Sequence, residues 1–304
     1  MSAPEPSPGG GRFGFVGAGR MGGPMVRRLL AAGHRVTVLE LSPAARAELA
    51  GDGADVTTDV REVAAGEVIG VCVHTDAQVR AACLDSGLID AMAPGSALVV
   101  HTTCSPRTID LLGEHAERRG VAVVDAAISG GPHDIAAGRI TLFVGGSADA
   151  VERVRPFLAA YGDPILSLGP RGTGQRVKLI NNAVFAANIG LLAQAVAVAA
   201  ELDVPEASLL RSLRHGSGTS RALDGVAASG SVAGFAEAVG EFLGKDIAVV
   251  QQITAELGVG LGALDDAHRV LVPLFAPASD PPADPSSGPS AGPPQPSTPE
   301  VGAP

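Results

Sequence analysis

The chain has 304 residues, 46% of them hydrophobic, which is enough for about two domains that each bury a core of ordinary size. Its formal net charge of −10 argues against a nucleic-acid partner, because binding to phosphates requires a basic surface. The three cysteines, Cys72, Cys83 and Cys104, are few and odd in number, which disfavours a disulfide framework. These totals favour an enzyme of small metabolites in a reducing, cytoplasmic compartment.

The two ends of the chain differ in composition from the rest. Residues 1–11 lack the apolar stretch of a signal peptide, so we expect a short flexible lead-in. Residues 277–304 are dominated by proline, serine, glycine and alanine, and a segment of this kind buries too little apolar surface to fold. We therefore predict a disordered tail there.

The first structured stretch combines a strand, a glycine-rich turn and a helix. An apolar strand is expected at 12–16 and a helix at 24–32. The turn between them is a G-x-G-x-x-G motif formed by Gly17, Ala18, Gly19, Arg20, Met21 and Gly22. The glycines allow a tight turn and a close backbone approach, and the helix N-terminus offers free amides to a pyrophosphate. We expect these six residues to bind a dinucleotide.

A second strand, at 35–39, ends at Glu40, roughly 20 residues after the glycine-rich turn. An acidic side chain at this place accepts hydrogen bonds from the ribose hydroxyls of adenosine and repels a 2′-phosphate. The sequence therefore predicts NAD as the cofactor, with NADP possible. The glycine motif alone also fits a structural turn that binds no nucleotide, but the strand, the helix and Glu40 around it favour a dinucleotide site.

Short β-branched runs alternate with helical patterns up to residue 170. Further strands are expected at 67–73, 96–101, 120–125, 140–144 and 164–168. Helices between them include 76–82 and 106–118. This alternation predicts an α/β Rossmann domain over residues 12–170 with a doubly wound parallel sheet.

Ligands of such sheets bind beyond the carboxyl ends of the strands. The ends of two expected strands carry Val73, His74 and Thr103, which we expect beside the cofactor. The turn after another strand holds Ser129, Gly130 and Gly131. Its amides and hydroxyl suit a carboxylate, although a tripeptide of this kind is also common as a plain linker turn.

Three histidines, His74, His101 and His133, invite a catalytic or metal-binding interpretation. None of them has a partner at the spacing of metal ligands. We expect surface or packing histidines and no metal site.

From residue 171 the pattern becomes all-helical, with helices expected at 175–201, 205–215 and 236–257. Residues 183–200 carry no charge but include two polar amides, so we expect a buried helix of a soluble protein and no membrane span. Unbroken, this helix measures about 40 Å and links the first domain to a helical domain over 171–276. Its uncharged surface predicts a homodimer or homotetramer built through that domain.

Lys178, Asn181 and Asn182 share one face at the polar start of this helix, because they are spaced i, i+3 and i+4. Lys178 and Lys245 are the only lysines, and every other cationic position holds arginine. Lysine, unlike arginine, can release its proton, and partial burial lowers its pKa. We expect Lys178 to act as a general acid/base. A snorkelling surface lysine beside two capping asparagines fits the same residues.

Four motifs in order resemble the β-hydroxyacid dehydrogenase family, typified by 3-hydroxyisobutyrate dehydrogenase and tartronate semialdehyde reductase. They are GFVGAGRMGGPM at 14–25, DAAISGG at 125–131, GTGQRVKLINN at 172–182 and GKD at 244–246. The resemblance covers about residues 12–252. It implies a Rossmann domain joined to a helical domain through a long helix, and NAD(P)-dependent oxidation of a small 3-hydroxy acid.

The same resemblance implies roles for individual residues. Lys178 matches the acid/base and Asn182 matches the asparagine that binds substrate beside it. The residues that match the binding site of the substrate carboxylate are Ser129, Gly130 and Gly131. Lys245 matches a lysine near the nicotinamide and the substrate.

The chain also departs from the family. Ala127 stands where proline is usual, and a glycine-rich loop and last helix are not recognisable after Leu257. Two other functions stay open. One is a catalytically silent nucleotide-binding scaffold, against which the intact Lys178 and Asn182 argue. The other is imine reductase-like reduction of a C=N bond, in relatives that usually replace the lysine.

Overall fold

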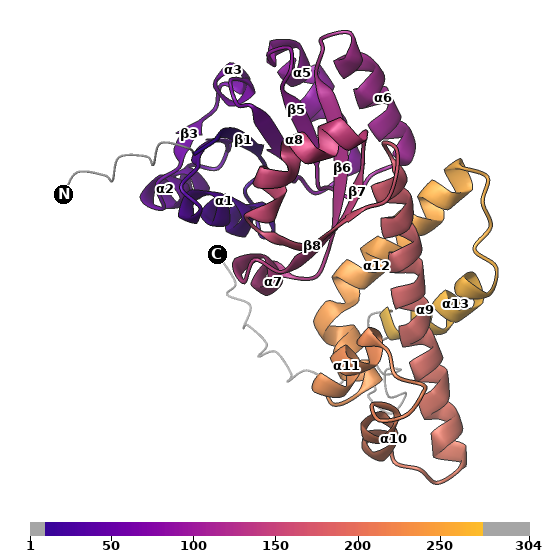
Figure 1. Ribbon diagram of the computed structural model, residues 1–304. Coiled ribbons are helices and arrows are strands. Elements are labelled where there is room, and N and C mark those ends of the chain that lie inside the picture. The colour runs from indigo at the N-terminus through magenta and orange to yellow at the C-terminus, as the bar shows by residue number, and fades with distance from the viewer. Residues whose placement is uncertain (1–9, 276–304) are drawn as a thin grey trace, which may run out of the picture.

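The computed structural model describes residues 10–275; the predictions for 1–9 and for the tail at 277–304 lie outside the described residues. An α/β part holds the sheet, and a helical arm projects from it along one long helix (Figure 1). The expected fold, a Rossmann-type domain followed by an all-helical part, is confirmed.

The sheet has eight strands in the order β3-β2-β1-β4-β5-β6-β7-β8. Their bounds are β1 Arg12–Val16, β2 Arg35–Leu39, β3 Asp55–Thr57, β4 Val68–Val71, β5 Ala97–Val100, β6 Ala122–Ser129, β7 Ile140–Gly145 and β8 Gly162–Ser167. Strands β1 to β6 all pair in parallel. Their carboxyl ends therefore lie at one edge of the sheet, where a Rossmann fold binds its ligand.

Strand β7 is the exception, because it pairs with β6 in antiparallel fashion while β8 runs parallel to β7. The connection from Ser129 to Ile140 holds only the short helix α7, Pro132–Ala136. A parallel neighbour would require a crossover of about a dozen residues or more to return to the opposite edge. The chain instead turns back at the carboxyl edge, so the sheet is mostly parallel with two reversed strands.

Helices cover both faces of the sheet (Figure 1). They are α1 Gly22–Ala31, α2 Pro43–Gly51, α3 Val60–Ala64, α4 Asp76–Arg80 with a π-helical turn at Ala81–Asp85, α5 Leu88–Ala91, α6 Pro106–Glu117 and α8 Ala148–Ala159. One core includes Phe15, Met25 and Phe157, and the other includes Ile69, Leu98 and Ile109. Strands β4 and β5 are buried at every position, which explains their continuous apolar sequences.

The helical part consists of α9 Thr173–Glu201, α10 Glu206–Leu213, α11 Arg221–Ala228, α12 Val232–Glu256 and α13 Ala263–Phe275. Helix α9 lies against β6 and β7 near its start and against α11, α12 and α13 farther along. By length and composition it could cross a membrane, but these contacts make it a core helix of the fold.

Helix α13 corrects one expectation, because a last helix does follow Leu257. Gly258 and Gly262 both have positive φ and turn the chain between α12 and α13. Ala267 of α13 then crosses α9 at Gly190, where a Cβ would overlap the Ala267 carbonyl oxygen. Glycine at this crossing lets the two helices approach closely.

Candidate active site

The glycine-rich turn connects β1 to α1 at the carboxyl edge of the sheet. Gly17 has a φ of +87°, and a Cβ on it would lie 2.5 Å from the Cys72 carbonyl oxygen, so glycine is required here. Helix α1 begins without a side-chain cap and has no acidic residue in its first turn. No described atom lies within 4 Å of where a Cβ on Gly19 would be. A helix N-terminus with open space beside it suits an anionic pyrophosphate.

Glu40 follows the last residue of β2, on the strand next to the glycine-rich turn. Its side chain is half-buried, and its carboxylate accepts a hydrogen bond of 2.9 Å from the amide of Ser42. This bond holds the carboxylate at the carboxyl edge, at the place where an acidic residue meets a ribose in dinucleotide-binding folds.

The ends of β4 and β5 are tied together by one hydroxyl. Thr102 Oγ1 accepts a hydrogen bond from the amide of Val73 at 2.9 Å and donates one to the Val73 carbonyl at 3.0 Å. Thr103, the next residue, is half-buried, and His74 is exposed. The predicted cofactor residues of these two strands therefore lie on adjacent, connected loops.

Helix α9 is anchored in the sheet domain by a buried carboxylate. Asp125 of β6 is fully buried and accepts hydrogen bonds from the amides of Gly172 at 2.6 Å and Gln175 at 2.8 Å. Burial raises the pKa of Asp125, and these amide bonds oppose that rise. They pair amides at the start of α9 that would otherwise be unsatisfied. The helix that carries Lys178 thus starts from a fixed point on β6.

Lys178 lies on α9 one turn beyond Gln175 and is half-buried. Burial lowers the pKa of its ammonium group, and the negative charge of Asp246 on α12 opposes that effect. Asn182 is buried on the next turn, where its Oδ1 accepts a hydrogen bond from Asn181 at 3.3 Å. A desolvated amine that interacts electrostatically with a carboxylate is suited to acid/base chemistry.

Lys245 of α12 joins the helical part of the molecule to the sheet domain. Its Nζ donates a hydrogen bond to the carbonyl oxygen of His74 at 2.9 Å and lies 3.3 Å from His74 Nδ1. Two of the predicted site residues, far apart in sequence, are thus brought into contact. Burial raises the pKa of Asp246, the next residue, and the positive charges of Lys178 and Lys245 oppose that rise.

The turn at Ser129, Gly130 and Gly131 is closed by α7. Gly130 has a φ of +129°, and the Gly131 amide donates to Asp134 Oδ2 at 2.8 Å. Ser129 is the last residue of β6, four positions after Asp125, on one of the strands that α9 contacts. Within the described residues, no hydrogen bond joins this turn to Lys178.

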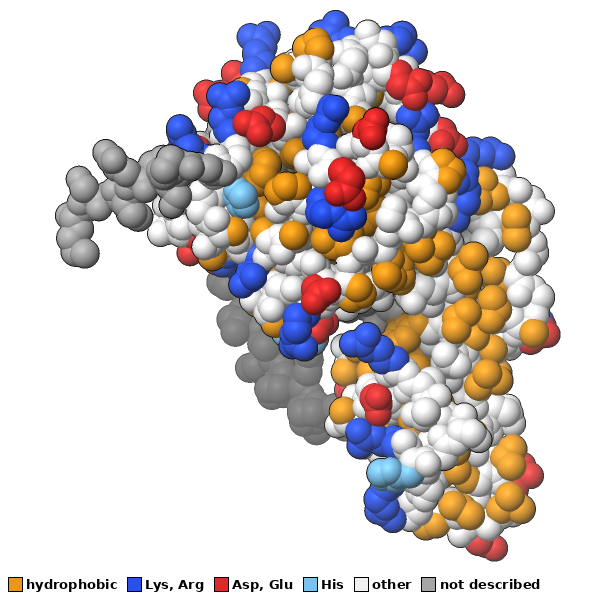
Figure 2. Space-filling view, viewed as in Figure 1, with side chains coloured by type: hydrophobic (Ala, Val, Ile, Leu, Met, Phe, Trp, Pro, Cys, Tyr) orange, Lys and Arg blue, Asp and Glu red, His pale blue; other side chains and the backbone are white. Residues whose placement is uncertain are grey.

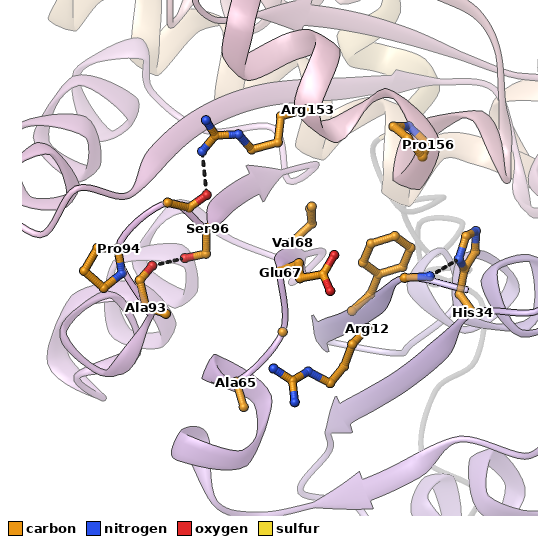
Figure 3. Close-up of a pocket in the computed structure, with 14 residues that line it drawn as sticks. Arg12, His34, Ala65, Glu67, Val68, Ala93, Pro94, Ser96, Arg153 and Pro156 are labelled. Atoms are coloured by element: carbon orange, nitrogen blue, oxygen red, sulfur yellow. Dashed lines mark hydrogen bonds between the residues drawn. The ribbon is translucent and has the colours of Figure 1, made fainter. Parts of the chain in front are cut away.

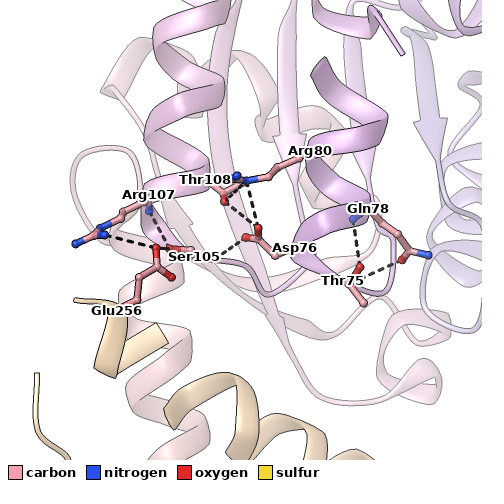
Figure 4. Close-up of polar contacts among 8 residues, drawn as sticks. All are labelled: Thr75, Asp76, Gln78, Arg80, Ser105, Arg107, Thr108 and Glu256. Atoms are coloured by element: carbon pink, nitrogen blue, oxygen red, sulfur yellow. Dashed lines mark hydrogen bonds and ion pairs between the residues drawn. The ribbon is translucent and has the colours of Figure 1, made fainter. Parts of the chain in front are cut away.

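A polar cluster fastens the far end of α12 to the sheet domain (Figure 4). Glu256 pairs with Arg107 at 3.7 Å and accepts a hydrogen bond of 3.4 Å from Ser105 Oγ. Asp76 of α4 accepts hydrogen bonds from the Ser105 amide at 2.9 Å and from Thr108 Oγ1 at 3.0 Å. Helix α12 is therefore held against the sheet domain near both Lys245 and Glu256.

A cavity of about 530 Å³ lies away from this site, at the amino edge of the sheet (Figure 3). Phe13 and Val68 form part of its apolar wall, and Arg12, Glu67 and Arg153 are among its polar residues. It contains none of the predicted site residues. Because parallel strands bind their ligands at the carboxyl edge, we place the active site there and not in this cavity.

Three neighbours of the site were not assigned roles from the sequence, namely Asp125, Gln175 and Asp246. Each stands inside one of the four quoted motifs, so the sequence did contain a signal for them. Their roles depend on contacts across the fold, which spacing alone does not reveal. Of the histidines, His101 is buried between the Ala126 carbonyl and the Tyr161 hydroxyl, as expected for a packing residue.

Comparison with known proteins agrees with this geometry. Residues 12–169 match the NAD-binding domain of 6-phosphogluconate dehydrogenase, and residues 172–281 match the NAD-binding domain of NADP-dependent 3-hydroxyisobutyrate dehydrogenase. An NAD-dependent L-serine dehydrogenase of Pseudomonas aeruginosa is 34% identical over 212 residues, covering 69% of this chain and 71% of that protein.

Solved structures show the same architecture. A Mycobacterium tuberculosis 3-hydroxyisobutyrate dehydrogenase, solved with L-serine, superposes with a TM-score of 0.77 at 26% identity, covering 86% of this chain and 92% of that one. An imine reductase from a Pseudomonas species has a TM-score of 0.59 at 18% identity, covering 86% and 92%, and so shares the fold alone. The chain thus belongs to the 3-hydroxyisobutyrate dehydrogenase family of NAD(P)-dependent β-hydroxyacid dehydrogenases.

Proposed function

We propose that this enzyme interconverts a small 3-hydroxy acid and its semialdehyde or keto form, with Lys178 as the general acid/base. The observation that carries the proposal is the position of Lys178. It is the desolvated amine on the helix that leaves the carboxyl edge of the sheet, with a pKa lowered by burial and a carboxylate, Asp246, nearby. A lysine in that environment can exchange a proton nearer neutral pH than a free lysine can.

We assign nucleotide binding to the domain at 12–170. The helical domain at 171–276 is assigned the role of enclosing the substrate. The residues proposed to hold NAD are Gly17, Ala18, Gly19, Arg20, Met21, Gly22, Glu40, Val73, His74, Thr103 and Lys245. The uncapped start of α1 and the open space at Gly19 support pyrophosphate binding there. When bound, the nicotinamide supplies the hydride acceptor or donor of the reaction.

The protein groups then have separate tasks. The amine of Lys178 takes the proton from the substrate hydroxyl in oxidation and returns it in reduction. Asn182 hydrogen-bonds the substrate beside it, and the amides and hydroxyl of residues 129–131 hold the carboxylate. Lys245 donates a hydrogen bond to the His74 carbonyl, which holds α12 against the loop after β4 beside the proposed cofactor site.

Glu40 supports a preference for NAD over NADP. Its carboxylate is held at the end of β2 by the Ser42 amide, at the position where it meets ribose hydroxyls. A 2′-phosphate placed there would meet a negative charge, and the resulting repulsion weakens binding of NADP.

The outer face of α9 supports assembly with a second copy through the helical domain. Large apolar residues on one side of this helix are 43% to 69% exposed: Ile180, Val184, Leu191, Val198 and Leu202. A hollow of about 460 Å³ beside α10 continues this strip, and Figure 2 shows hydrophobic side chains gathered over this arm. Contiguous apolar surface of this extent marks an interaction site, so we propose a homodimer or homotetramer.

The free cysteines support a cytoplasmic location.

The experiment is a substrate panel with the purified full chain. The names of the relatives suggest L-serine and 3-hydroxyisobutyrate as the first acids to test, each with NAD and with NADP. Reduction of NAD by at least one small 3-hydroxy acid is the expected result. Binding of NADH without turnover of any acid would support the scaffold alternative instead. Oxidation of a reduced cofactor by a cyclic imine, with no turnover of acids, would support imine reduction.

A further inference from the structure

Gln175 is a buried amide whose two ends are both engaged by one loop of the sheet domain. Its side chain is fully buried, its Nε2 donates to the Thr102 carbonyl at 2.8 Å, and its Oε1 accepts from the Cys104 amide at 3.1 Å. These two bonds flank Thr103, the residue that we place beside the nicotinamide. The amide thus fixes the backbone on both sides of Thr103.

The same residue is connected to two further strands. Its own amide donates to Asp125 of β6, and the Thr102 that it binds is bonded through Oγ1 to Val73 at the end of β4. The side chain and the backbone amide of one residue on α9 therefore link β6 to the loop after β5 and, through Thr102, to the loop after β4. Lys178 lies three positions farther along the same helix, so its backbone is fixed relative to the same loops.

Filling space does not account for an amide at this position. A methionine would occupy a similar volume without the cost of removing an amide from water, which is offset only when both of its ends are paired. The side-chain amide adds a fixed orientation of the loop on the helix, because it has one donor and one acceptor that both bond the loop. A polar group buried and paired in this way is suited to positioning the groups around it.

We propose that Gln175 is a positioning residue that couples the cofactor loop at 102–104 to the helix carrying Lys178. It touches neither substrate nor cofactor and acts through Thr103 and Lys178. The inference rests on the proposed function for its effect on turnover, while its effect on cofactor binding stands independently. Binding of NAD then sets the loop and the amine in one arrangement.

The test compares Gln175→Met and Gln175→Glu with a matched control, Gln251→Met. Gln251 lies on the exposed side of α12, where its Nε2 donates to Asp265 Oδ1 at 3.0 Å. Binding is read from the fluorescence of NADH itself and turnover from steady-state kinetics, with thermal melting to give the folded fraction. We expect Gln175→Met to raise the NADH Kd about tenfold and to lower kcat about 10- to 100-fold, because small displacements of catalytic groups cost factors of this order.

The Gln175→Glu variant supplies a readout that loss of packing would not give. In Gln175→Glu, an ionised carboxylate would place an acceptor oxygen opposite the Thr102 carbonyl oxygen, so the hydrogen bond would be lost. A protonated carboxyl group would donate to that carbonyl as the glutamine does. Relative to wild type, Gln175→Glu should bind NADH better near pH ~5 than near pH ~8, and Gln175→Met should show no such dependence. Gln251→Met should match wild type throughout.

Two results would overturn the inference. One is NADH affinity and kcat in Gln175→Met within about twofold of wild type. The other is a lower melting temperature with unchanged affinity and turnover per folded molecule, which would make Gln175 a stability residue only. Failure of the proposed function is distinguishable, because wild type would then turn over no hydroxy acid while the NADH comparison among variants could still be made.

Discussion

Asp246 should set the pH at which the enzyme becomes active. Burial lowers the pKa of Lys178, and the charge of Asp246 holds it up against that effect. Neutralising this carboxylate removes an attraction that favours the charged amine, and such an attraction is stronger for partly buried groups than for groups in water. The Asp246→Asn variant should therefore lower the pKa of Lys178 and ease the loss of its proton.

The assay is kcat/KM for oxidation of the hydroxy acid as a function of pH. Activity should rise with pH as Lys178 loses its proton, and in Asp246→Asn the rising limb should move toward acid, so that activity on the acid side of the limb exceeds that of wild type. A matched control is Asp224→Asn, which removes an exposed carboxylate that pairs with Arg214 at 2.9 Å. A limb that stays in place in Asp246→Asn, or moves to higher pH, would refute the electrostatic reasoning.

Three further changes test other parts of the site. Glu40→Ala should narrow the difference between the NAD and NADP dissociation constants, and an unchanged ratio would remove Glu40 from cofactor selection. Leu191→Asp places a charge in the apolar strip of α9, so light scattering should show dissociation to monomers, whereas a wild-type monomer at micromolar concentration would contradict the assembly. Asp125→Ala leaves the buried amides of Gly172 and Gln175 unpaired and should lower the free energy of unfolding by about 2–5 kcal/mol. A urea midpoint equal to that of wild type would show that Asp125 does not stabilise the start of α9.

The sequence predicts the start of the fold well because its signals there are local. A strand, three glycines and a helix follow one another directly in the chain, and the positive φ of Gly17 is a requirement of the turn itself. The long helix α9 is likewise predicted, since its apolar stretch is too long and uncharged for any other element. Its start at Thr173 differs from expectation by two residues.

Features that depend on contacts between distant segments were missed. The reversal of β7 follows from the short connection that holds α7. The sequence of β7 predicts a strand but does not indicate whether that strand pairs in parallel or antiparallel fashion. The position of helix α13 depends on its packing against α9, where Ala267 meets Gly190. The electrostatic interaction of Asp246 with Lys178 and the hydrogen bond of Lys245 to His74 join segments far apart in the chain. No periodicity or spacing encodes such contacts.

The central claim, that Lys178 exchanges the proton, is tested most directly by the pH profile of Lys178→Arg. Arginine keeps the positive charge but cannot release a proton near neutral pH. The account predicts that kcat falls by ~10²–10⁴, that NADH binding is retained, and that the rising limb of kcat/KM is lost. Full activity of Lys178→Arg with an unchanged pH profile would contradict the assignment and point to Lys245 instead.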